Sequence, residues 1–234
     1  MENPETSHAY TRDSAPAFSA QKLEYIYEAV FRQSTQQPGF YYEDMGSHMT
    51  SSAFRQRMVE LKEGLTAVSQ RRANLRLNYQ WMGRFSHQHT SQFHRDSAHP
   101  HSFLMLGYEP TAVDSRVYVA DFSKLIEQHG IPLATYFGGS QEVNVAAEAP
   151  SIAPYVTELT PFPKDHYRLL VLNNSKSFQK PTFGMFHRGE VQQKQSAEDR
   201  IINSIMLYMA NPEEEEQHTQ QDISNFVNTQ QVNR

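Results

Sequence analysis

A histidine and an aspartate two positions apart, His94 and Asp96, most constrain what this 234-residue chain can fold into. On a β-strand, residues i and i+2 leave the same face, so this imidazole and this carboxylate would lie side by side. His187 stands much farther along the chain, which leaves room for several strands before the chain returns. If His187 lies beside the first pair, two histidines and one carboxylate face a single metal ion.

The segments around these residues favour strands. Residues 167–172 form an apolar run that ends at Asn173-Asn174, a residue type that favours turns. After His187, a polar connection leads to a second apolar run over residues 201–208, which follows Arg200. A chain with eleven histidines will contain a His-x-Asp pair by chance, so the order of the flanking segments is more informative than the pair itself.

This order of His-x-Asp, buried strand, distal histidine and arginine resembles the Fe(II)/2-oxoglutarate-dependent dioxygenase superfamily, over roughly residues 75–210. The resemblance is to the superfamily and to no particular member. It implies a double-stranded β-helix (jelly-roll) core, with Fe(II) bound by His94, Asp96 and His187. It also implies 2-oxoglutarate as a cosubstrate that is decarboxylated to succinate while a substrate is hydroxylated or otherwise oxidised.

The far carboxylate of 2-oxoglutarate needs a cation, and the planar fork of arginine binds a carboxylate through two hydrogen bonds. Arg200 is the predicted anchor, and Ser204 would add a hydroxyl from the same strand face. Lys194 is the alternative cation, although it falls in the polar connection. Arg200 could also serve only as a partner of Glu190 or Asp199.

From Leu75 the pattern alternates with a period of two, which predicts a strand. One face would carry Arg76, Asn78 and Gln80, and the other Leu77, Tyr79 and Trp81. The resemblance implies that this strand supplies a polar residue to the 2-oxoglutarate carboxylate, for which Arg76, Asn78, Tyr79 and Gln80 are candidates. We include Asn78 and Tyr79 in the predicted cosubstrate site.

The N-terminal part of the chain predicts helices. Residues 1–19 form a polar arm, and Ser19 would cap a first helix that Pro38-Gly39 stops. A second helix from Thr50 to Arg72, capped by Ser51 or Ser52, carries one apolar stripe: Phe54, Met58, Leu61, Leu65 and Val68. We expect both helices to pack on the outer face of one sheet.

These patterns predict a mainly β chain with N-terminal helices, an α+β class. We expect one domain over residues 20–210, with helical support over 20–72 and the β-helix core over 75–210. Residues 131–165 are rich in proline and form the least regular part of this core. Residues 211–234 are acidic and polar, and we expect them to form a solvated tail that could include one short amphipathic turn around Ile223, Phe226 and Val227.

The composition excludes several classes. Cysteine is absent, so disulfides and thiolate metal sites are excluded. No apolar run has the 18 residues of a membrane span, and the polar N-terminus lacks a signal-peptide core, so we expect a cytoplasmic protein. The net charge of −5 makes nucleic acid an unlikely partner, although Arg71, Arg72, Arg76 and Arg84 could form a local basic groove.

Two other functions fit the same residues. Five of the eleven histidines fall between residues 87 and 101, and His87-x-His89 resembles the first half of a cupin metal motif. The glutamate of that motif is missing, because Thr90, Ser91 and Gln92 follow. A cupin-like metal-binding protein or a catalytically inactive β-helix binding module are therefore the alternatives. For an enzyme, we expect a small-molecule substrate first and a protein side chain second, while the sequence leaves the oligomeric state open.

Overall fold

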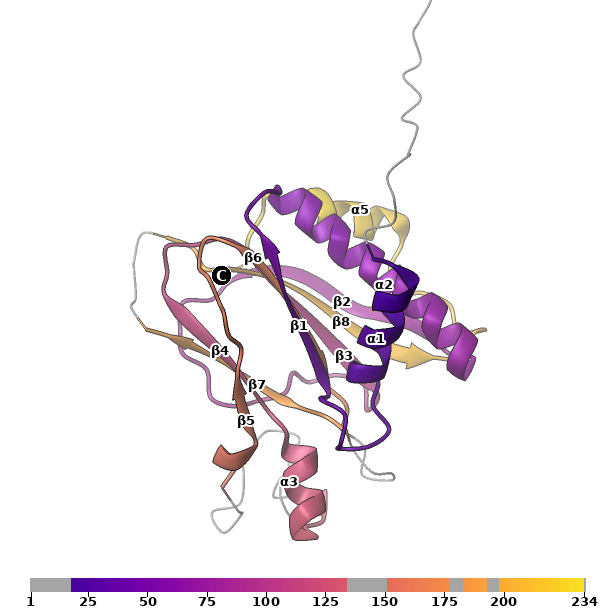
Figure 1. Cartoon of the computed structure of the whole chain (residues 1–234). Coiled ribbons are helices and arrows are strands. Elements are labelled where there is room, and N and C mark those ends of the chain that lie inside the picture. The colour runs from indigo at the N-terminus through magenta and orange to yellow at the C-terminus, as the bar shows by residue number, and fades with distance from the viewer. Residues whose placement is uncertain (1–17, 134–150, 177–182, 193–197, 234) are drawn as a thin grey trace, which may run out of the picture.

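The computed structural model describes residues 18–133, 151–176, 183–192 and 198–233. In this part of the chain, eight strands form two antiparallel sheets, and four α-helices accompany them. Figure 1 shows three of the helices beside the larger sheet and one short helix near the end of the smaller sheet. The predicted α+β class with mainly β character is confirmed.

The larger sheet has the strand order β1-β6-β3-β8-β2, and the smaller sheet has the order β5-β4-β7. Neighbours within each sheet are distant in the sequence, so the chain crosses repeatedly from one sheet to the other. The strands of the larger sheet are β1 (Phe40–Gly46), β2 (Arg76–Ser86), β3 (Ser102–Tyr108), β6 (Tyr167–Asn173) and β8 (Ile201–Ala210). Those of the smaller sheet are β4 (Ser115–Ala120), β5 (Val156–Glu158) and β7 (Phe186–Val191).

The described residues form four α-helices, of which the first ends at Val30, before the predicted stop at Pro38-Gly39. They are α1 (Ala20–Val30), α2 (Ser51–Ala73), α3 (Phe122–His129) and α5 (Gln220–Asn228). Ser19 caps α1 as predicted. The predicted cap of α2 is wrong, because the Thr50 hydroxyl accepts the hydrogen bond from the Ala53 N–H at 3.1 Å. Thr50 has the extended backbone that an N-cap requires, whereas Ser51 and Ser52 already lie inside the helix.

The central strands are covered on both faces. Leu169 and Val171 of β6 belong to the cluster beneath the helices, and the predicted stripe of α2 is buried in the same cluster. Leu170 and Leu172 belong to a second cluster between the two sheets. Side chains that alternate between two buried faces require a nearly continuous apolar run. The predicted buried strand over residues 167–172 is therefore confirmed.

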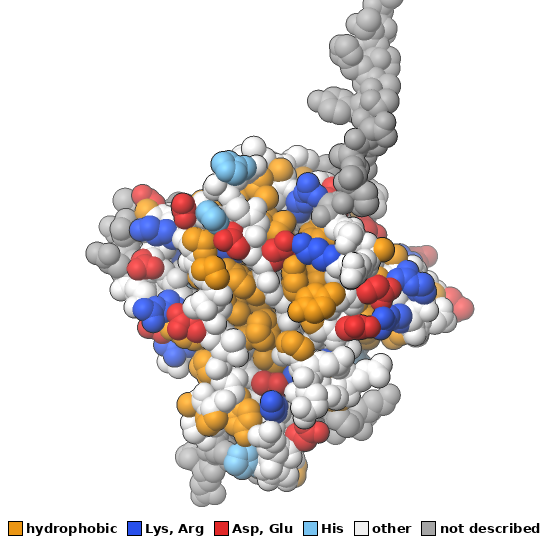
Figure 2. Space-filling model, in the orientation of Figure 1, with side chains coloured by type: hydrophobic (Ala, Val, Ile, Leu, Met, Phe, Trp, Pro, Cys, Tyr) orange, Lys and Arg blue, Asp and Glu red, His pale blue; other side chains and the backbone are white. Residues whose placement is uncertain are grey.

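The edge strand β1 carries an aromatic group that joins the first helix to the sheet. Tyr41 packs with the cluster beneath the helices, and Tyr42 packs with the cluster between the sheets. Tyr25 of α1 meets Tyr41 edge to face, with ring centroids 6.2 Å apart. Figure 2 shows hydrophobic side chains gathered across the middle of this face, where β1 lies. These contacts join α1 to the edge of the larger sheet.

The predicted alternation along β2 is correct only for its first half. The register with β8 shifts between Tyr79 and Trp81, which leaves Gln80 as a bulge. Leu77 and Tyr79 pack beneath the helices, whereas Trp81 packs between the sheets. The extra residue changes the phase of the strand, so Trp81 does not share a face with Tyr79. β2 continues to Ser86.

The C-terminal segment differs from the solvated tail that its composition predicts. Helix α5 lies against α2 and β2, and its Ile223, Phe226 and Val227 are buried beneath the helices. Only these positions of α5 face the protein, which explains how a polar segment can belong to the core.

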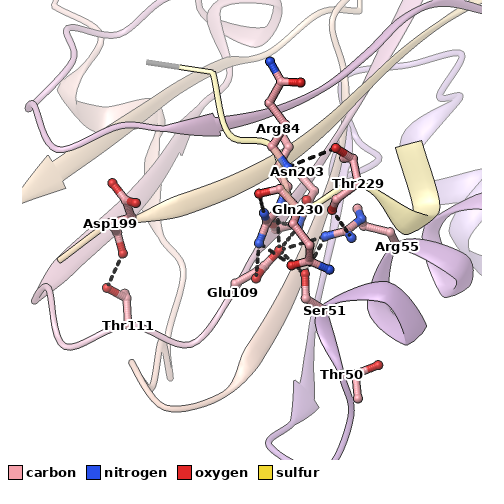
Figure 3. A network of polar contacts seen from close by, with 12 residues as sticks. Thr50, Ser51, Arg55, Arg84, Glu109, Thr111, Asp199, Asn203, Thr229 and Gln230 are labelled. Carbon is pink, nitrogen blue, oxygen red and sulfur yellow. Dashed lines mark hydrogen bonds and ion pairs between the residues drawn. The ribbon is translucent and has the colours of Figure 1, made fainter. Parts of the chain in front are cut away.

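Buried arginines hold the backbone that follows α5 (Figure 3). Arg55 donates to the carbonyls of Val227 and Thr229, and Arg84 donates to the carbonyl of Gln230. Both arginines also pair with the Glu109 carboxylate, at 3.3 and 3.1 Å. The segment is therefore fixed through its own carbonyl oxygens, and few of its side chains need to be apolar.

The arginines predicted to form a local basic groove are largely neutralised. Arg71 and Arg72 pair with Glu24 of α1, and Arg72 also pairs with Glu28. Arg84 is buried against Glu109. These pairings leave little unbalanced positive charge at Arg71, Arg72 and Arg84. Separately, the helices of the described residues include none with the length and apolar character of a membrane span.

Replacing Phe226 tests whether α5 belongs to the core. Phe226→Ala should lower the free energy of unfolding by about 3 kcal/mol, because it removes a buried aromatic ring and leaves a cavity. Chemical denaturation measures this change. Gln221→Ala on the exposed face of the same helix is the control and should change stability by about 0.5 kcal/mol or less. Equal, small effects of both substitutions would show that α5 is not part of the core.

Candidate metal centre

The backbone places His94 directly beside the distal histidine. The His94 N–H donates to the His187 carbonyl at 3.1 Å, and the His187 N–H donates to the His94 carbonyl at 2.9 Å. This reciprocal exchange defines a hydrogen-bonded antiparallel pair. Nearby, the Ser91 N–H donates to the Gly189 carbonyl at 2.9 Å. The segment before Asp96 therefore runs along the edge of β7, and this contact needs no metal.

Asn174 fixes the second member of the His-x-Asp pair. Its side-chain oxygen accepts from the Asp96 N–H at 3.1 Å, and its amide donates to the Asp96 carbonyl at 3.0 Å. The amide also donates to the Ser102 hydroxyl at 3.0 Å, and the whole residue is buried. The Asn174 side chain thus makes the two hydrogen bonds that a neighbouring strand would otherwise make with the backbone of Asp96. Asn174, which the sequence predicts as a turn residue, is in fact a positioning residue of the site.

The three predicted ligands come together. One ligand atom each from His94, Asp96 and His187 lies within 4.8 Å of the others. His94 Nε2 is 3.6 Å from Asp96 Oδ1, and the two imidazole centroids are 4.2 Å apart. His187 is buried, whereas the other two are half-buried. These side chains could hold a metal ion, and the described ranges contain no second group of this kind.

The hydrogen bonds and burial of the group favour a metal-binding state. His94 Nδ1 lies 2.8 Å from the Gln92 carbonyl, so this nitrogen donates there, and Nε2 is the ring nitrogen that lies near Asp96 and could bind a metal. Burial lowers the pKa of His187 well below its usual value, and the nearby His94 and His87 add to the effect. His187 is therefore neutral near pH 7, as a metal ligand must be. Its buried Nδ1 has no hydrogen-bond partner.

Burial raises the pKa of Asp96, although His94 and Arg95 oppose this shift. A carboxylate in such surroundings is stabilised by a bound cation. Two histidines and a carboxylate on one side of a metal leave coordination positions open for other molecules. A metal ion held only by these three side chains would therefore keep positions at which a further ligand could bind.

Arg200, the predicted anchor, is buried close to this group. Its Nε donates to the Ser115 hydroxyl at 3.0 Å, and its Nη1 donates to the His87 carbonyl at 3.2 Å. Its guanidinium lies 5.4 Å from the centre of the Tyr108 ring, and burial lowers its pKa. Only 2% of Arg200 is exposed, its Nη2 has no partner, and no carboxylate pairs with it among the described residues.

The predicted pairing of Arg200 with Glu190 or Asp199 is therefore not observed: Glu190 pairs with Arg188, and Asp199 accepts from Ser86. Ser204 lies on β8 as predicted, buried and with no partner for its hydroxyl. Lys194 lies outside the described residues.

The two candidates from β2 do not join this group. Tyr79 faces the helices, where the Lys62 ammonium lies 4.4 Å from its ring centre. Asn78 is buried near the C-terminal segment, and its amide lies 3.4 Å from the Glu214 carbonyl. Both assignments to the cosubstrate site are wrong, because the metal ligands lie along the smaller sheet, whereas Tyr79 points away from that sheet and Asn78 is occupied elsewhere.

Other positions of the sequence prove more relevant. Tyr108 ends β3 beneath the Arg200 guanidinium, and Arg168 opens β6 on the strand beside it. A polar residue at the end of an otherwise apolar strand was the available signal for both. His87 and His89, the cupin-like pair, do not belong to the metal-ligand group of the described residues.

Comparisons of the chain with models of protein families and with curated proteins find no match. The interpretation of this site therefore depends on its own geometry and chemistry.

Metal titration tests the site directly. Mn(II) or Zn(II) added to metal-free protein should bind with a stoichiometry of about one and raise the unfolding temperature, because a ligand of the folded state stabilises it. His187→Ala should remove this response, since it deletes a buried ligand. His89→Ala, a histidine of the preceding exposed loop, is the matched control and should retain it. Calorimetry that shows equal affinity for the wild type and His187→Ala would reject the site.

Proposed function

We propose that this chain is a non-haem Fe(II)- and 2-oxoglutarate-dependent oxygenase. The observation that carries the proposal is a buried arginine, Arg200, that has no carboxylate partner among the described residues and lies next to two histidines and one aspartate that can hold a metal. Burying an unpaired charge is costly, so an anion is the expected occupant of this position.

The strand order supports a double-stranded β-helix core for this proposal. In chain order, β2, β3, β6 and β8 belong to the larger sheet, while the His94 segment, β4 with β5, and β7 belong to the smaller one. The core strands therefore alternate between two facing sheets, apart from the adjacent pair β4 and β5. Two antiparallel sheets linked in this way are typical of a jelly roll.

The donor set fits ferrous iron. Two imidazoles and a carboxylate with open positions are the ligands that non-haem Fe(II) oxygenases use. When bound, Fe(II) would supply the oxidation of a substrate by dioxygen, coupled to decarboxylation of 2-oxoglutarate. The residues of the chain would hold the metal, keep His187 neutral and bind the charged end of the cosubstrate.

The spacing between the metal ligands and Arg200 suits a short dicarboxylic acid. Gly189 lies two residues after His187, so the two positions face the same side of β7, about 7 Å apart. A Cβ at Gly189 would lie 3.3 Å from Arg200 Nη2, so glycine leaves room for the guanidinium. One end of 2-oxoglutarate would reach the metal while the other meets Arg200, Ser204 and the Tyr108 hydroxyl. A small molecule is the first candidate for the substrate, and a protein side chain is the second.

A spectroscopic experiment tests the proposed function. Anaerobic addition of Fe(II) and 2-oxoglutarate should produce a weak visible charge-transfer band, and His187→Ala should abolish it. His89→Ala should keep the band. A protein that binds metal but gives no band with 2-oxoglutarate would be a cupin-like metal-binding protein. Binding of neither would identify an inactive β-helix module, and either outcome rejects the oxygenase.

Substitution of the anchor makes a second, kinetic test. Arg200→Ala should raise the KM for 2-oxoglutarate roughly a hundredfold, because loss of a buried charged partner costs about 3 kcal/mol. Iron affinity should stay nearly unchanged, since Arg200 does not belong to the metal-ligand group. Release of succinate measures the KM, with the exposed Arg116→Ala as control. An unaltered KM would place the anchor at another residue.

A further inference from the structure

Arg168 is the second fully buried arginine that lacks a carboxylate partner in the described part of the chain. The other buried arginines are paired: Arg32 with Asp121, and both Arg55 and Arg84 with Glu109. Arg168 is 2% exposed, and only one of its nitrogens has a hydrogen bond there, from Nη2 to the Glu109 carbonyl at 2.9 Å. Its buried Nε has no partner. The chain neutralises its other buried arginines but not Arg168 and Arg200.

The sheet register places Arg168 beside the predicted cosubstrate group. Arg168 of β6 lies opposite Tyr108 of β3, and Tyr108 lies opposite Ile202 of β8. Directly opposed residues share a face, and Arg200 precedes Ile202 by two positions, so all four side chains leave the same face. Arg168 and the start of β8 are separated by one intervening strand, or about 10 Å. Two arginine side chains can both reach a small anion across this distance.

Aromatic rings connect the two arginines. The Arg200 guanidinium lies 5.4 Å from the centre of the Tyr108 ring, and the Arg168 guanidinium lies 4.3 Å from that of Phe162. The Tyr108 and Phe162 rings meet edge to face, with centroids 5.2 Å apart. Each arginine is thus oriented by a ring, and this leaves nitrogen atoms of both free for a ligand.

The two positive charges affect each other. Burial lowers the pKa of Arg168 to about 10, and the charge of Arg200 adds to this effect. Tyr108, which is affected by both arginines, stays protonated at neutral pH because burial raises its pKa to about 12. The group therefore offers two cations and one hydroxyl donor. Asp44 of β1, directly opposite Arg168 in the sheet, offsets part of this charge, but it pairs with His166 and forms no ion pair with Arg168. An anion that enters would relieve the repulsion and the cost of burial together.

We propose that Arg168 is a second cosubstrate-binding residue, and that Arg168 and Arg200 together bind the carboxylate farthest from the metal ligands. The proposal rests on the proposed function, because it assigns this carboxylate to 2-oxoglutarate. It predicts that the site selects dicarboxylic over monocarboxylic acids. Arg200 alone would be sufficient to bind one carboxylate, so the contribution of Arg168 is to strengthen the discrimination.

Metal-free protein allows this selectivity to be measured without catalysis. Glutarate, a five-carbon diacid, should raise the unfolding temperature of the wild type, whereas butyrate at equal concentration and ionic strength should not. Arg168→Met should weaken glutarate affinity at least tenfold, and Arg168→Lys should restore part of it, because the charge returns. The exposed Arg116→Met is the control and should bind as the wild type does.

Arg168→Gln keeps a donor for the Glu109 carbonyl and replaces the methionine variant if that variant does not fold. Wild-type affinity for glutarate in a folded Arg168 variant would overturn the proposal, as would equal binding of glutarate and butyrate to the wild type. These outcomes are separate from failure of the oxygenase, because glutarate binding requires no iron. A protein that binds glutarate through Arg168 but shows no charge-transfer band would keep this anion site and lose the proposed activity.

Discussion

The reciprocal backbone hydrogen bonds between His94 and His187 are the contact on which the site depends. They join a segment at the end of a long loop to a strand that forms much later in the chain. The metal ligands are therefore positioned by sheet geometry and not by the metal itself. Asn174 completes the arrangement, because its amide serves Asp96 as a strand partner. A site built in this way is preorganised, so metal binding would lose less free energy to the ordering of the ligands.

The buried arginines divide into two kinds that correspond to the two faces of the larger sheet. On the helix side, Arg55 and Arg84 pair with Glu109 and hold the C-terminal backbone. On the side of the smaller sheet, Arg168 and Arg200 have aromatic neighbours and form no ion pair with a carboxylate of the described residues. A paired cation contributes to the fold, whereas an unpaired one is a cost that a ligand can remove. This contrast makes ligand binding the simplest reason for the second pair.

The sequence predicts the parts of this structure that depend on residue type and local period. The apolar run of β6 and the stripe of α2 follow from such patterns, whereas the approach of His187 to His94 and Asp96 was expected only from the superfamily resemblance. The bulge at Gln80 could not be predicted, because one extra residue in a strand does not change the composition of the segment. The bulge nevertheless moves Trp81 to the opposite face of the sheet. The structural roles of Asn174 and of the C-terminal segment were predicted incorrectly for a related reason. Their polar groups bond to distant backbone atoms, and such partners are set by the tertiary structure alone.

The difference between the two faces of the larger sheet explains why a small polar site can exist inside this fold without preventing the chain from folding. The cluster beneath the helices contains most of the buried aromatic and aliphatic side chains, and it is closed by α5. The cluster between the sheets is smaller, and it borders the unpaired nitrogens of Arg168 and Arg200. Hydrophobic burial on one face thus offsets the cost of polar atoms left without partners on the other. Unpaired groups persist only where the surrounding structure is stable enough to hold them, and in enzymes such groups are concentrated where ligands bind.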